Sequence, residues 1–343
     1  MTSVSPLLSV RGLTTIFDLP GGPAAAVDRV SFDLRPGETL CLVGESGSGK
    51  SLTAYSILRI VPPPGRIAVG EVVFKGRDLL RLPEHEMQRV RGGEIGLVFQ
   101  EPASALDPVF TIGALIAETL LTHGRAASRR DARARAIEIL RRVSIPDPDR
   151  RVDDYPHQLS GGLRQRAMIA LATACAPALL IADEPTTALD ATVQAQVLDL
   201  LREMRDAAGL ALLLITHDLG VVAETADRVA IMYAGRIVEE GPVRGVLRDP
   251  KHPYTRALLA SIPGGTPGQP LAAIPGHVPA LGSAPEGCGF GPRCVHRFEA
   301  CDTAAPALTE AGPDRLVRCF LHSPDADTAS VAPVGVTHAR TAD

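Results

Sequence analysis

The sequence contains a glycine-rich octapeptide, Gly44-Glu45-Ser46-Gly47-Ser48-Gly49-Lys50-Ser51, which fits the pattern G-x-x-x-x-G-K-S/T. It follows an apolar run at 39–43 that reads as a strand, and it precedes a run of helical character at 51–60. Glycines let successive backbone N–H groups turn inward around phosphate oxygens where a helix begins. The octapeptide therefore predicts a nucleotide site in which Lys50 reaches the β- and γ-phosphates and Ser51 binds Mg²⁺.

Outward from this loop, apolar runs alternate with helical runs. Short strands are predicted at 7–10, 30–34, 39–43, 179–182 and 212–216, further strands between 67 and 100, and helices at 51–60, 111–143 and 191–208. Such alternation is typical of an α/β fold with a mostly parallel sheet covered on both faces. A domain is predicted at 1–250 and an extension at 251–322, within which the Pro/Gly-rich stretch 262–287 reads as a loop or linker; residues 323–343 are expected to be disordered.

The composition excludes several classes of protein. Of the 343 residues, 45% are hydrophobic and 22% charged, which excludes a disordered chain and a small disulfide scaffold. A net charge of -4, with no Trp and four Tyr, argues against nucleic acid as a partner. The longest uncharged run, 167–182, is shorter than the roughly 20 apolar residues of a membrane span, and residues 1–6 lack the features of a signal peptide. We therefore expect a soluble, intracellular protein.

A second motif supplies the acids that a nucleotide site needs. The apolar run 179–182 delivers Asp183 and Glu184 at its end. An acid at the end of such a strand holds the Mg²⁺ of a phosphate-binding loop, and we assign this role to Asp183. The neighbouring Glu184 is predicted to act as the general base that polarises the attacking water.

Further motifs define the kind of nucleotide protein. They are Gln100 after a strand, Leu159-Ser160-Gly161-Gly162 at a helix start, Ala188-Leu189-Asp190 after the acidic pair, and His217 after the third apolar strand. The whole set, in this order, resembles the ATP-binding-cassette (ABC) ATPases over about residues 5–250. The resemblance implies a P-loop domain with a parallel-sheet core, an antiparallel β subdomain and a helical subdomain at about 101–165.

The resemblance also implies roles for these residues. Ser160, Gly161 and Gly162 would close over ATP held by the P-loop of a second subunit, at an interface organised by Asp190. Gln100 would sense the γ-phosphate and Mg²⁺ and couple to a membrane subunit, and His217 would contact the γ-phosphate.

Phe17, in the strand region before the P-loop, is a candidate for stacking on adenine, and a core phenylalanine is the equal alternative.

Three stretches resemble the peptide/nickel importer ATPases: 187–197, 230–241, and the run from Lys251 to Leu259 that continues into Cys288-Gly-Phe-Gly-Pro-Arg-Cys294. The likeness is to the first of the paired ATPases in dipeptide and oligopeptide importers. It implies a second, distinct ATPase subunit, two permease subunits, an extracytoplasmic peptide-binding protein, and a place on the cytoplasmic face of the membrane. Nickel and glutathione remain alternative cargoes.

Four cysteines in the extension, Cys288, Cys294, Cys301 and Cys319, have the spacing C-x5-C-x6-C-x17-C. Disulfides are not expected in a reducing cytosol, so four thiolates on a segment with little core of its own indicate a metal site. The spacing dictates neither zinc nor an iron–sulfur cluster. The resemblance favours a [4Fe–4S] cluster, with zinc as the alternative and His296 and His322 as substitute zinc ligands. Cys41 and Cys175 are predicted core residues.

A basic stretch at 125–142 carries seven Arg against two acidic residues. It reads either as a surface for nucleic acid or lipid or as a solvated helix face, and we favour the helix face. Two rival classes share the motifs of the first domain. A soluble cassette protein of DNA repair or translation would carry a large insertion or a second cassette, and an exporter would not carry the peptide-type extension.

Overall fold

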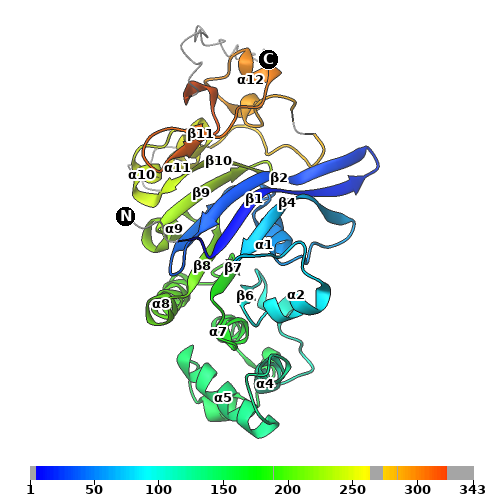
Figure 1. Cartoon of the computed structure of the whole chain (residues 1–343). Helices are drawn as coiled ribbons and strands as arrows, with labels where there is room; N and C mark the ends of the chain where they lie inside the picture. The colour runs from blue at the N-terminus through cyan, green and yellow to red at the C-terminus, as the bar shows by residue number, and fades with distance from the viewer. Residues whose placement is uncertain (1–4, 188, 263–272, 284, 323–343) are drawn as a thin grey trace, which may run out of the picture.

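The fold is described by a computed structural model that covers residues 5–187, 189–262, 273–283 and 285–322. Two sheets lie at its centre (Figure 1), and the larger has the strand order β11-β12-β10-β9-β3-β8-β7-β6. Its parallel part consists of β6 (Ile95–Val98), β7 (Leu179–Asp183), β8 (Ala211–Thr216), β3 (Thr39–Val43) and β9 (Arg228–Tyr233). The strand β10 (Arg236–Pro242) pairs antiparallel with β9.

The parallel strands are buried along their length, which is why they read as continuous apolar runs in the sequence. They are covered by α1 (Lys50–Ile57), α7 (Gly161–Thr173), α8 (Ala191–Ala208) and α9 (Leu219–Thr225). The carboxyl ends of parallel strands lie along one edge of a sheet. That edge receives the P-loop after β3, Glu184 after β7 and His217 after β8.

The smaller sheet is antiparallel, with the order β2-β1-β4-β5. Its strands are β1 (Leu8–Leu19), β2 (Gly22–Leu34), β4 (Gly65–Phe74) and β5 (Arg77–Asp78). Strands occur at the predicted places 7–10 and 30–34, but the predicted lengths were too short, because β1 and β2 form one long hairpin. The register of the hairpin shifts between Val10 and Leu13, and these irregularities interrupt the alternating pattern on which the sequence prediction relied.

Two helical predictions also needed correction. A helix predicted over 111–143 is two helices, α4 (Ile112–Thr122) and α5 (Arg129–Arg142). Gly124 turns with φ +63° between them, and Ser128 caps α5 by accepting a hydrogen bond from the Asp131 N–H at 3.1 Å. The polar stretch inside 67–100, for which no helix is predicted, forms α2 (Glu84–Val90).

A helical subdomain contains α3 (Pro102–Ala105), α4, α5, α6 (Pro148–Arg151), the 3-10 turn η1 (Pro156–Gln158) and α7. It forms the lower end of the molecule in Figure 1. The arginines of α5 pair with neighbouring carboxylates: Arg133 with Asp153, Arg135 with Asp131, and Arg141 with Glu138. These exposed pairs favour a solvated helix face over a basic binding surface.

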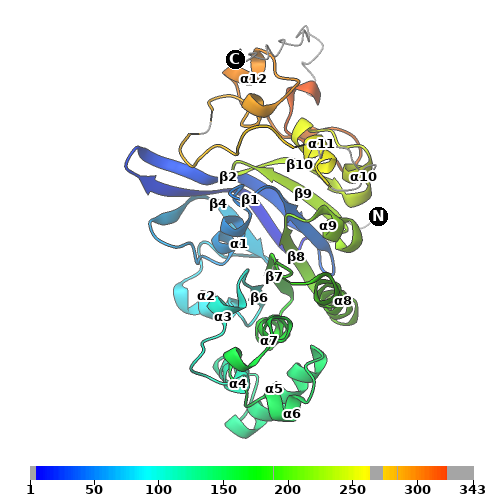
Figure 2. The same cartoon turned by 180° about the vertical axis from the view of Figure 1, so that it is seen from behind.

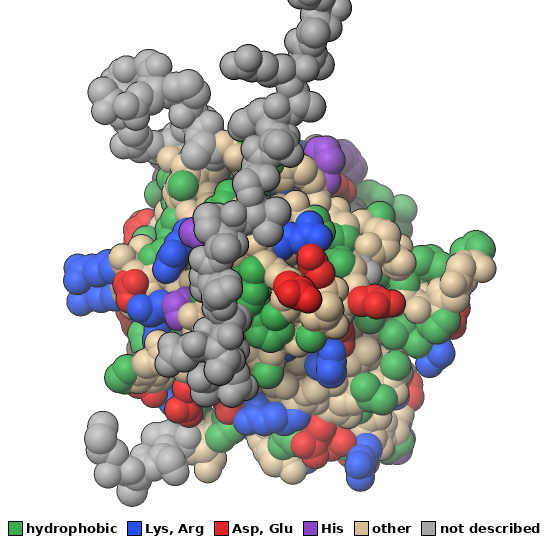
Figure 3. Space-filling view, turned by 90° about the horizontal axis from the view of Figure 1, so that it is seen from above, with side chains coloured by type: hydrophobic (Ala, Val, Ile, Leu, Met, Phe, Trp, Pro, Cys, Tyr) green, Lys and Arg blue, Asp and Glu red, His purple; other side chains and the backbone are tan. Residues whose placement is uncertain are grey.

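The C-terminal extension lies at the opposite end, as both cartoon views show (Figures 1 and 2). Its elements are α10 (Val243–Arg248), α11 (Pro253–Ala260), η2 (Gly291–Arg293), α12 (Ala300–Thr303), β11 (Thr309–Glu310), β12 (Leu316–Val317) and η3 (Phe320–His322). Because β12 pairs with β10, the extension continues the main sheet. Viewed from above, its face shows acidic and basic side chains interspersed (Figure 3).

The predicted disordered tail, 323–343, lies outside the described residues, as does 263–272 within the Pro/Gly-rich stretch. Among the helices that the structure describes, none is both long and apolar enough to cross a membrane.

Candidate active site

The P-loop joins β3 to α1 and is packed too closely for larger residues at two of its glycines. A Cβ atom on Gly44 would lie 2.1 Å from the Met232 carbonyl oxygen, and Gly49 adopts φ +100° beside the Ala26 carbonyl. Lys50 is buried, and its Nζ donates to the carbonyl oxygens of Gly44 at 2.8 Å and Glu45 at 3.0 Å. The loop therefore folds around its own lysine.

Burial lowers the pKa of Lys50, while the negative charges of Glu184, Asp183 and Glu45 oppose that shift. A bound polyphosphate would add further negative charge beside the Lys50 amine and would therefore favour its protonated, positively charged form.

Asp183 has the chemistry of a magnesium ligand. Its side chain is fully buried, and its Oδ1 accepts a hydrogen bond from Ser51 Oγ at 2.9 Å. Its Oδ2 is buried without a hydrogen-bond partner among the described residues, and burial raises the pKa of this carboxyl group. Hard divalent cations prefer oxygen ligands, and Asp183 Oδ2 and the Ser51 hydroxyl provide two of them. Ser51 and Asp183 therefore suit Mg²⁺, in line with the sequence prediction.

Glu184 is held by three side chains from three strand ends. Thr187 Oγ1 donates to Oε2 at 2.8 Å and Gln100 Nε2 to the same oxygen at 3.3 Å, while His217 Nδ1 lies 3.2 Å from Oε1. Although burial acts to raise it, the hydrogen bonds from Thr187 and His217 hold the pKa of Glu184 below its ordinary value. The ionised carboxylate can accept a proton from water.

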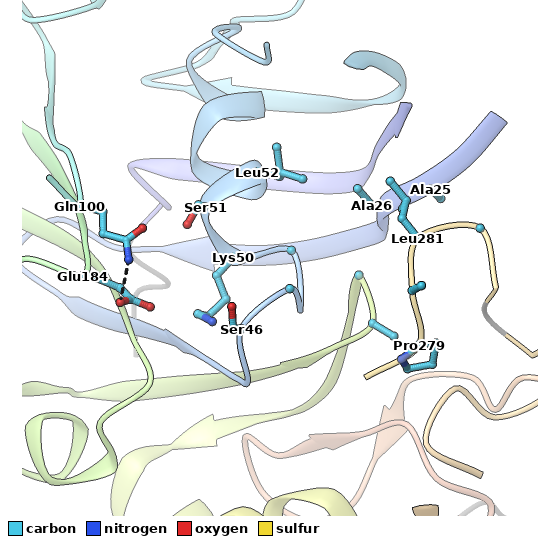
Figure 4. Close-up of a pocket in the computed structure, with 16 residues that line it drawn as sticks. Ala25, Ala26, Ser46, Lys50, Ser51, Leu52, Gln100, Glu184, Pro279 and Leu281 are labelled. Atoms are coloured by element: carbon cyan, nitrogen blue, oxygen red, sulfur yellow. Dashed lines mark hydrogen bonds between the residues drawn. The ribbon is translucent and has the colours of Figure 1, made fainter. Parts of the chain in front are cut away.

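The backbone of Glu184 adopts φ +46°, a left-handed conformation that costs a residue with a side chain about 1–2 kcal/mol. Local strain of this kind is retained where the surrounding structure needs the side chain in one direction. Here it directs the carboxylate towards Gln100 and Lys50 (Figure 4).

The P-loop lines a cavity of about 290 Å³. Gln100, Glu184, Lys50 and Ser51 lie on one side of it, as Figure 4 shows. Two further walls were not foreseen from the sequence. They are Ala25 and Ala26 of β2, and residues 279–282 of the extension. No motif marks these residues, because small and apolar side chains line many surfaces equally well.

Phe17 does not line this cavity. Its ring, half-buried on β1, lies so close to Gly65 that a Cβ atom there would be 2.7 Å from both Phe17 Cζ and Val61 Cγ1. The structure thus places Phe17 in packing contacts, and adenine stacking stays a prediction for this residue.

The remaining predicted nucleotide contacts lie away from the P-loop cavity. Ser160 is exposed and caps α7, its Oγ accepting from the Leu163 N–H at 3.4 Å. Gly161 faces open space, whereas Gly162 is pressed against Val193. Asp190 caps α8 by accepting from the N–H groups of Thr192 and Val193. One chain alone therefore does not bring these residues to its own P-loop.

The four cysteines of the extension are brought together. Cys288, Cys294, Cys301 and Cys319 line one small cavity that is also walled by Phe290, Phe298 and Phe320. All six cysteines of the chain, each within the described residues, are free thiols. Burial raises the pKa of Cys294 to about 11 and of Cys319 to about 12. Cys41 and Cys175 are buried in the core, as predicted.

Across the residues that the structure covers, no group of three or more His, Cys, Asp or Glu side chains is arranged around a single ion. A zinc ion requires four ligands at about 2.0–2.3 Å, which this arrangement does not provide as it stands. The donor set consists of four thiols in one apolar cavity, and thiolates are the ligands of both zinc and iron–sulfur clusters.

The parallel sheet, the P-loop and the acidic pair define an ATPase of the P-loop class. Residues 27–187 match the ABC transporter family, and residues 238–301 match the family described as the oligopeptide/dipeptide transporter, C-terminal region. The chain belongs to the ATP-binding proteins of ABC transporters, in the branch that carries this C-terminal region.

Two relatives from Bacillus subtilis are equally similar to the chain. The dipeptide transport ATP-binding protein DppD is 46% identical over 325 residues, 94% of this chain and 97% of its own length. The oligopeptide transport ATP-binding protein OppD is 46% identical over 329 residues, 95% of this chain and 92% of its own length. Among solved structures, the ATP-binding cassette MJ0796, a dimer bound to ADP and Pi after hydrolysis, aligns with a TM-score of 0.63. It is 29% identical and covers 69% of this chain and 99% of its own. These relatives confirm the predicted family, fold and ATPase class.

Proposed function

We propose that this chain is the ATP-hydrolysing subunit of a membrane importer that takes up peptides. The observation that carries the proposal is the arrangement at Glu184, where an ionised carboxylate lies beside the P-loop with Gln100 and His217 around it. The match of residues 238–301 to the oligopeptide/dipeptide transporter C-terminal region supports the choice of cargo.

In the proposed mechanism, Lys50 leaves the carbonyl groups of the P-loop and binds the β- and γ-phosphates of ATP. Ser51, Asp183 and Gln100 would hold Mg²⁺, which neutralises the charge that develops on the transferred phosphoryl group. Glu184 accepts the proton of the attacking water, and Thr187 keeps its carboxylate in place. His217 contacts the γ-phosphate from the end of β8.

A second ATPase subunit would complete the site. The exposed start of α7 at Ser160 presents a helix N-terminus, whose first N–H groups have no partner within the helix and whose dipole is positive, so it suits an anion arriving from another subunit. The ATP-binding cassette MJ0796 was solved as a dimer. We propose that a distinct partner ATPase, as in the paired importers that the sequence resembles, presents its P-loop to Ser160, Gly161 and Gly162, with Asp190 at the interface.

Contact with permease subunits would use an apolar surface beside the Q-loop, the segment that follows Gln100. Val109 and Phe110 are exposed to 69% and 47%, and Tyr155 to 38%. The Ile112 N–H donates to the Asp154 carbonyl at 2.9 Å, so these two chain segments lie side by side. Exposed apolar side chains gathered in this way are typical of a protein interface. Through the permeases the chain would work at the cytoplasmic face of the membrane, with an extracytoplasmic peptide-binding protein beyond them.

We further propose that Cys288, Cys294, Cys301 and Cys319 hold a [4Fe–4S] cluster, with zinc as the alternative. The shared apolar cavity supports this assignment. Protein purified without oxygen should be brown and contain equal amounts of iron and labile sulfide, and Cys294→Ser should remove both. Colourless protein with one zinc per chain would support the alternative instead.

The experiment that tests the importer is growth of the source cell, made auxotrophic for one amino acid, on peptides that supply it. Lengths of two to about six residues are compared in cells with the natural chain and with Glu184→Gln, which should bind ATP and fail to hydrolyse it. Failure of the variant on peptides, with normal growth on the free amino acid, would establish peptide import and name the length class. Equal identity to DppD and OppD leaves that length for the experiment to decide. Normal growth on every peptide would contradict the proposal and direct attention to nickel or glutathione.

A further inference from the structure

The extension contacts the P-loop directly at Glu45, the second residue of the loop. Arg293 Nη1 donates to both carboxylate oxygens of Glu45 at 3.1 Å, and its Nη2 donates to Oε2 at 3.2 Å. The Glu45 N–H also donates to the hydroxyl oxygen of Tyr254, in α11, at 2.9 Å. Both the side chain and the backbone of Glu45 are therefore held by residues of the extension.

Arg293 is well suited to hold a loop in one position. Its side chain is only 5% exposed, and its guanidinium lies 5.7 Å from the Tyr233 ring centre and 5.9 Å from that of Phe290. A forked, nearly buried pair with a carboxylate fixes direction as well as distance. A lysine at position 293 would keep the positive charge but would lose the paired N–H donors of the guanidinium.

The same arginine holds a second segment of the nucleotide cavity. Its Nε donates to the Pro275 carbonyl at 2.8 Å, where residues 275–282, here named the strap, begin. Pro279, Leu281 and Gly282 of the strap line the cavity, and Leu281 lies beside Ala25 and Ala26, on the side away from Gln100 and Glu184 (Figure 4). Leu281 is 41% exposed, an apolar side chain at the open rim of a polar site.

The direction of the nucleotide follows from these positions. The γ-phosphate must lie near Glu184 for water activation, so the nucleoside must extend towards the other end of the cavity, where the strap and β2 supply apolar walls. When ATP enters, Lys50 must exchange the Glu45 carbonyl for phosphate oxygens. The rest of the loop has to keep its shape during that exchange.

We propose that Arg293 is a positioning residue of the ATP site: it holds the P-loop through Glu45 and the strap through Pro275 in one binding-competent arrangement. The inference rests on the proposed ATP site and assigns part of that site to the extension. Arg293 does not touch the reacting atoms. It acts on affinity through two segments that do line the cavity.

The test is the Kd for Mg·ATP, measured by calorimetry on the full chain. Arg293→Gln should raise the Kd about 10-fold or more, the effect expected when a charge-assisted forked pair is lost. Arg293→Lys should recover part of the affinity. The matched control is Arg297→Gln in the same extension, whose pair with Asp302 is about half exposed and should leave the Kd unchanged.

A second variant keeps the test decisive if Arg293→Gln folds poorly. Glu45→Gln removes the same pair from the P-loop side, should raise the Kd by a similar factor, and should make the effect of Arg293→Gln in the double variant smaller than in the single one. An unchanged Kd for Arg293→Gln, even with a lower melting temperature, would overturn the inference and leave Arg293 a structural residue. Failure of the natural chain to bind Mg·ATP would overturn the proposed ATP site as well.

Discussion

Gln100 Nε2 donates a hydrogen bond to Glu184 Oε2 at 3.3 Å, so the segment that leads into the helical subdomain begins in contact with the proposed general base. Gln100 lies in the short connection between β6 and α3, whereas Glu184 directly follows the neighbouring strand β7. A displacement of the helical subdomain by a permease would therefore reach Glu184 through a single hydrogen bond. This relationship gives coupling between transport and hydrolysis a physical route.

Thr187→Val should change the pH dependence of ATP hydrolysis. The hydroxyl of Thr187 contributes to the lowered pKa of Glu184, so its loss raises that pKa. A general base works when it is ionised, so activity is present above its pKa and is lost as the pH falls through it. The acid limb of the pH–rate profile of the assembled complex should move to higher pH. Thr187→Ser, which keeps the hydroxyl, should not move it, and an unmoved limb in the valine variant would contradict the role of Thr187.

Asp183→Asn should abolish the thermal stabilisation that Mg·ATP gives over ATP alone. The buried Oδ2 of Asp183, which has no hydrogen-bond partner among the described residues, is the atom that a cation would satisfy. A ligand at about 100 times its Kd stabilises the folded state by about 2.7 kcal/mol, which thermal unfolding detects readily. Asp199→Asn, an exposed acid on α8, serves as control and should keep the full Mg²⁺ effect. Retention of that effect in Asp183→Asn would exclude this residue as a ligand.

Val109→Ser combined with Phe110→Ser should weaken association with the permeases about 10-fold or more, because both side chains lose apolar contact area. Basal Mg·ATP binding by the separate chain should be unchanged, since neither residue lines the nucleotide cavity. Co-purification with the membrane subunits measures the effect. Val69→Ser, at a valine that is 60% exposed on β4, is the matched control. Equal recovery of both variants with the permeases would place the docking surface elsewhere.

Arg315→Met should destabilise the chain by about 3–5 kcal/mol, because it leaves the fully buried carboxylate of Glu239 without its cation. Glu239 also accepts hydrogen bonds from the N–H groups of Lys251 and His252, at 2.8 and 2.9 Å. Loss of the Arg315 guanidinium should therefore also weaken the contact between β10 and the extension. Chemical denaturation measures the free energy of unfolding. Adding Glu239→Gln should recover part of the loss.

The comparison for Arg315 is Arg11→Met, which breaks an exposed pair with Asp33 and should cost less than about 1 kcal/mol. If Arg315→Met lowers the free energy of unfolding no more than Arg11→Met does, the buried pair of Arg315 with Glu239 does not stabilise the extension.

The sequence was sufficient for the parts of this protein that depend on local chemistry. The P-loop has a spacing that few other structures require, and Ser160 at a helix start and Asp183 with Glu184 gain their meaning from following it in this order. The helix at 191–208 was predicted with its observed bounds, because Asp190 caps its start and Gly209, with φ +64°, ends it. Buried parallel strands were also readable, since both of their faces must be apolar.

Contacts between distant segments were decided by the tertiary structure alone. Nothing in the sequence near Arg293 indicates that its guanidinium reaches Glu45, 248 positions away, because an arginine beside a cysteine can pair with any carboxylate that the fold supplies. The same holds for the strap, which lines the nucleotide cavity together with Ala25 of β2. The sequence by itself thus determined which chemistry this chain carries. The packing of the extension against the P-loop decided which residues hold that chemistry in place, because burial and direction arise only when the chain is folded.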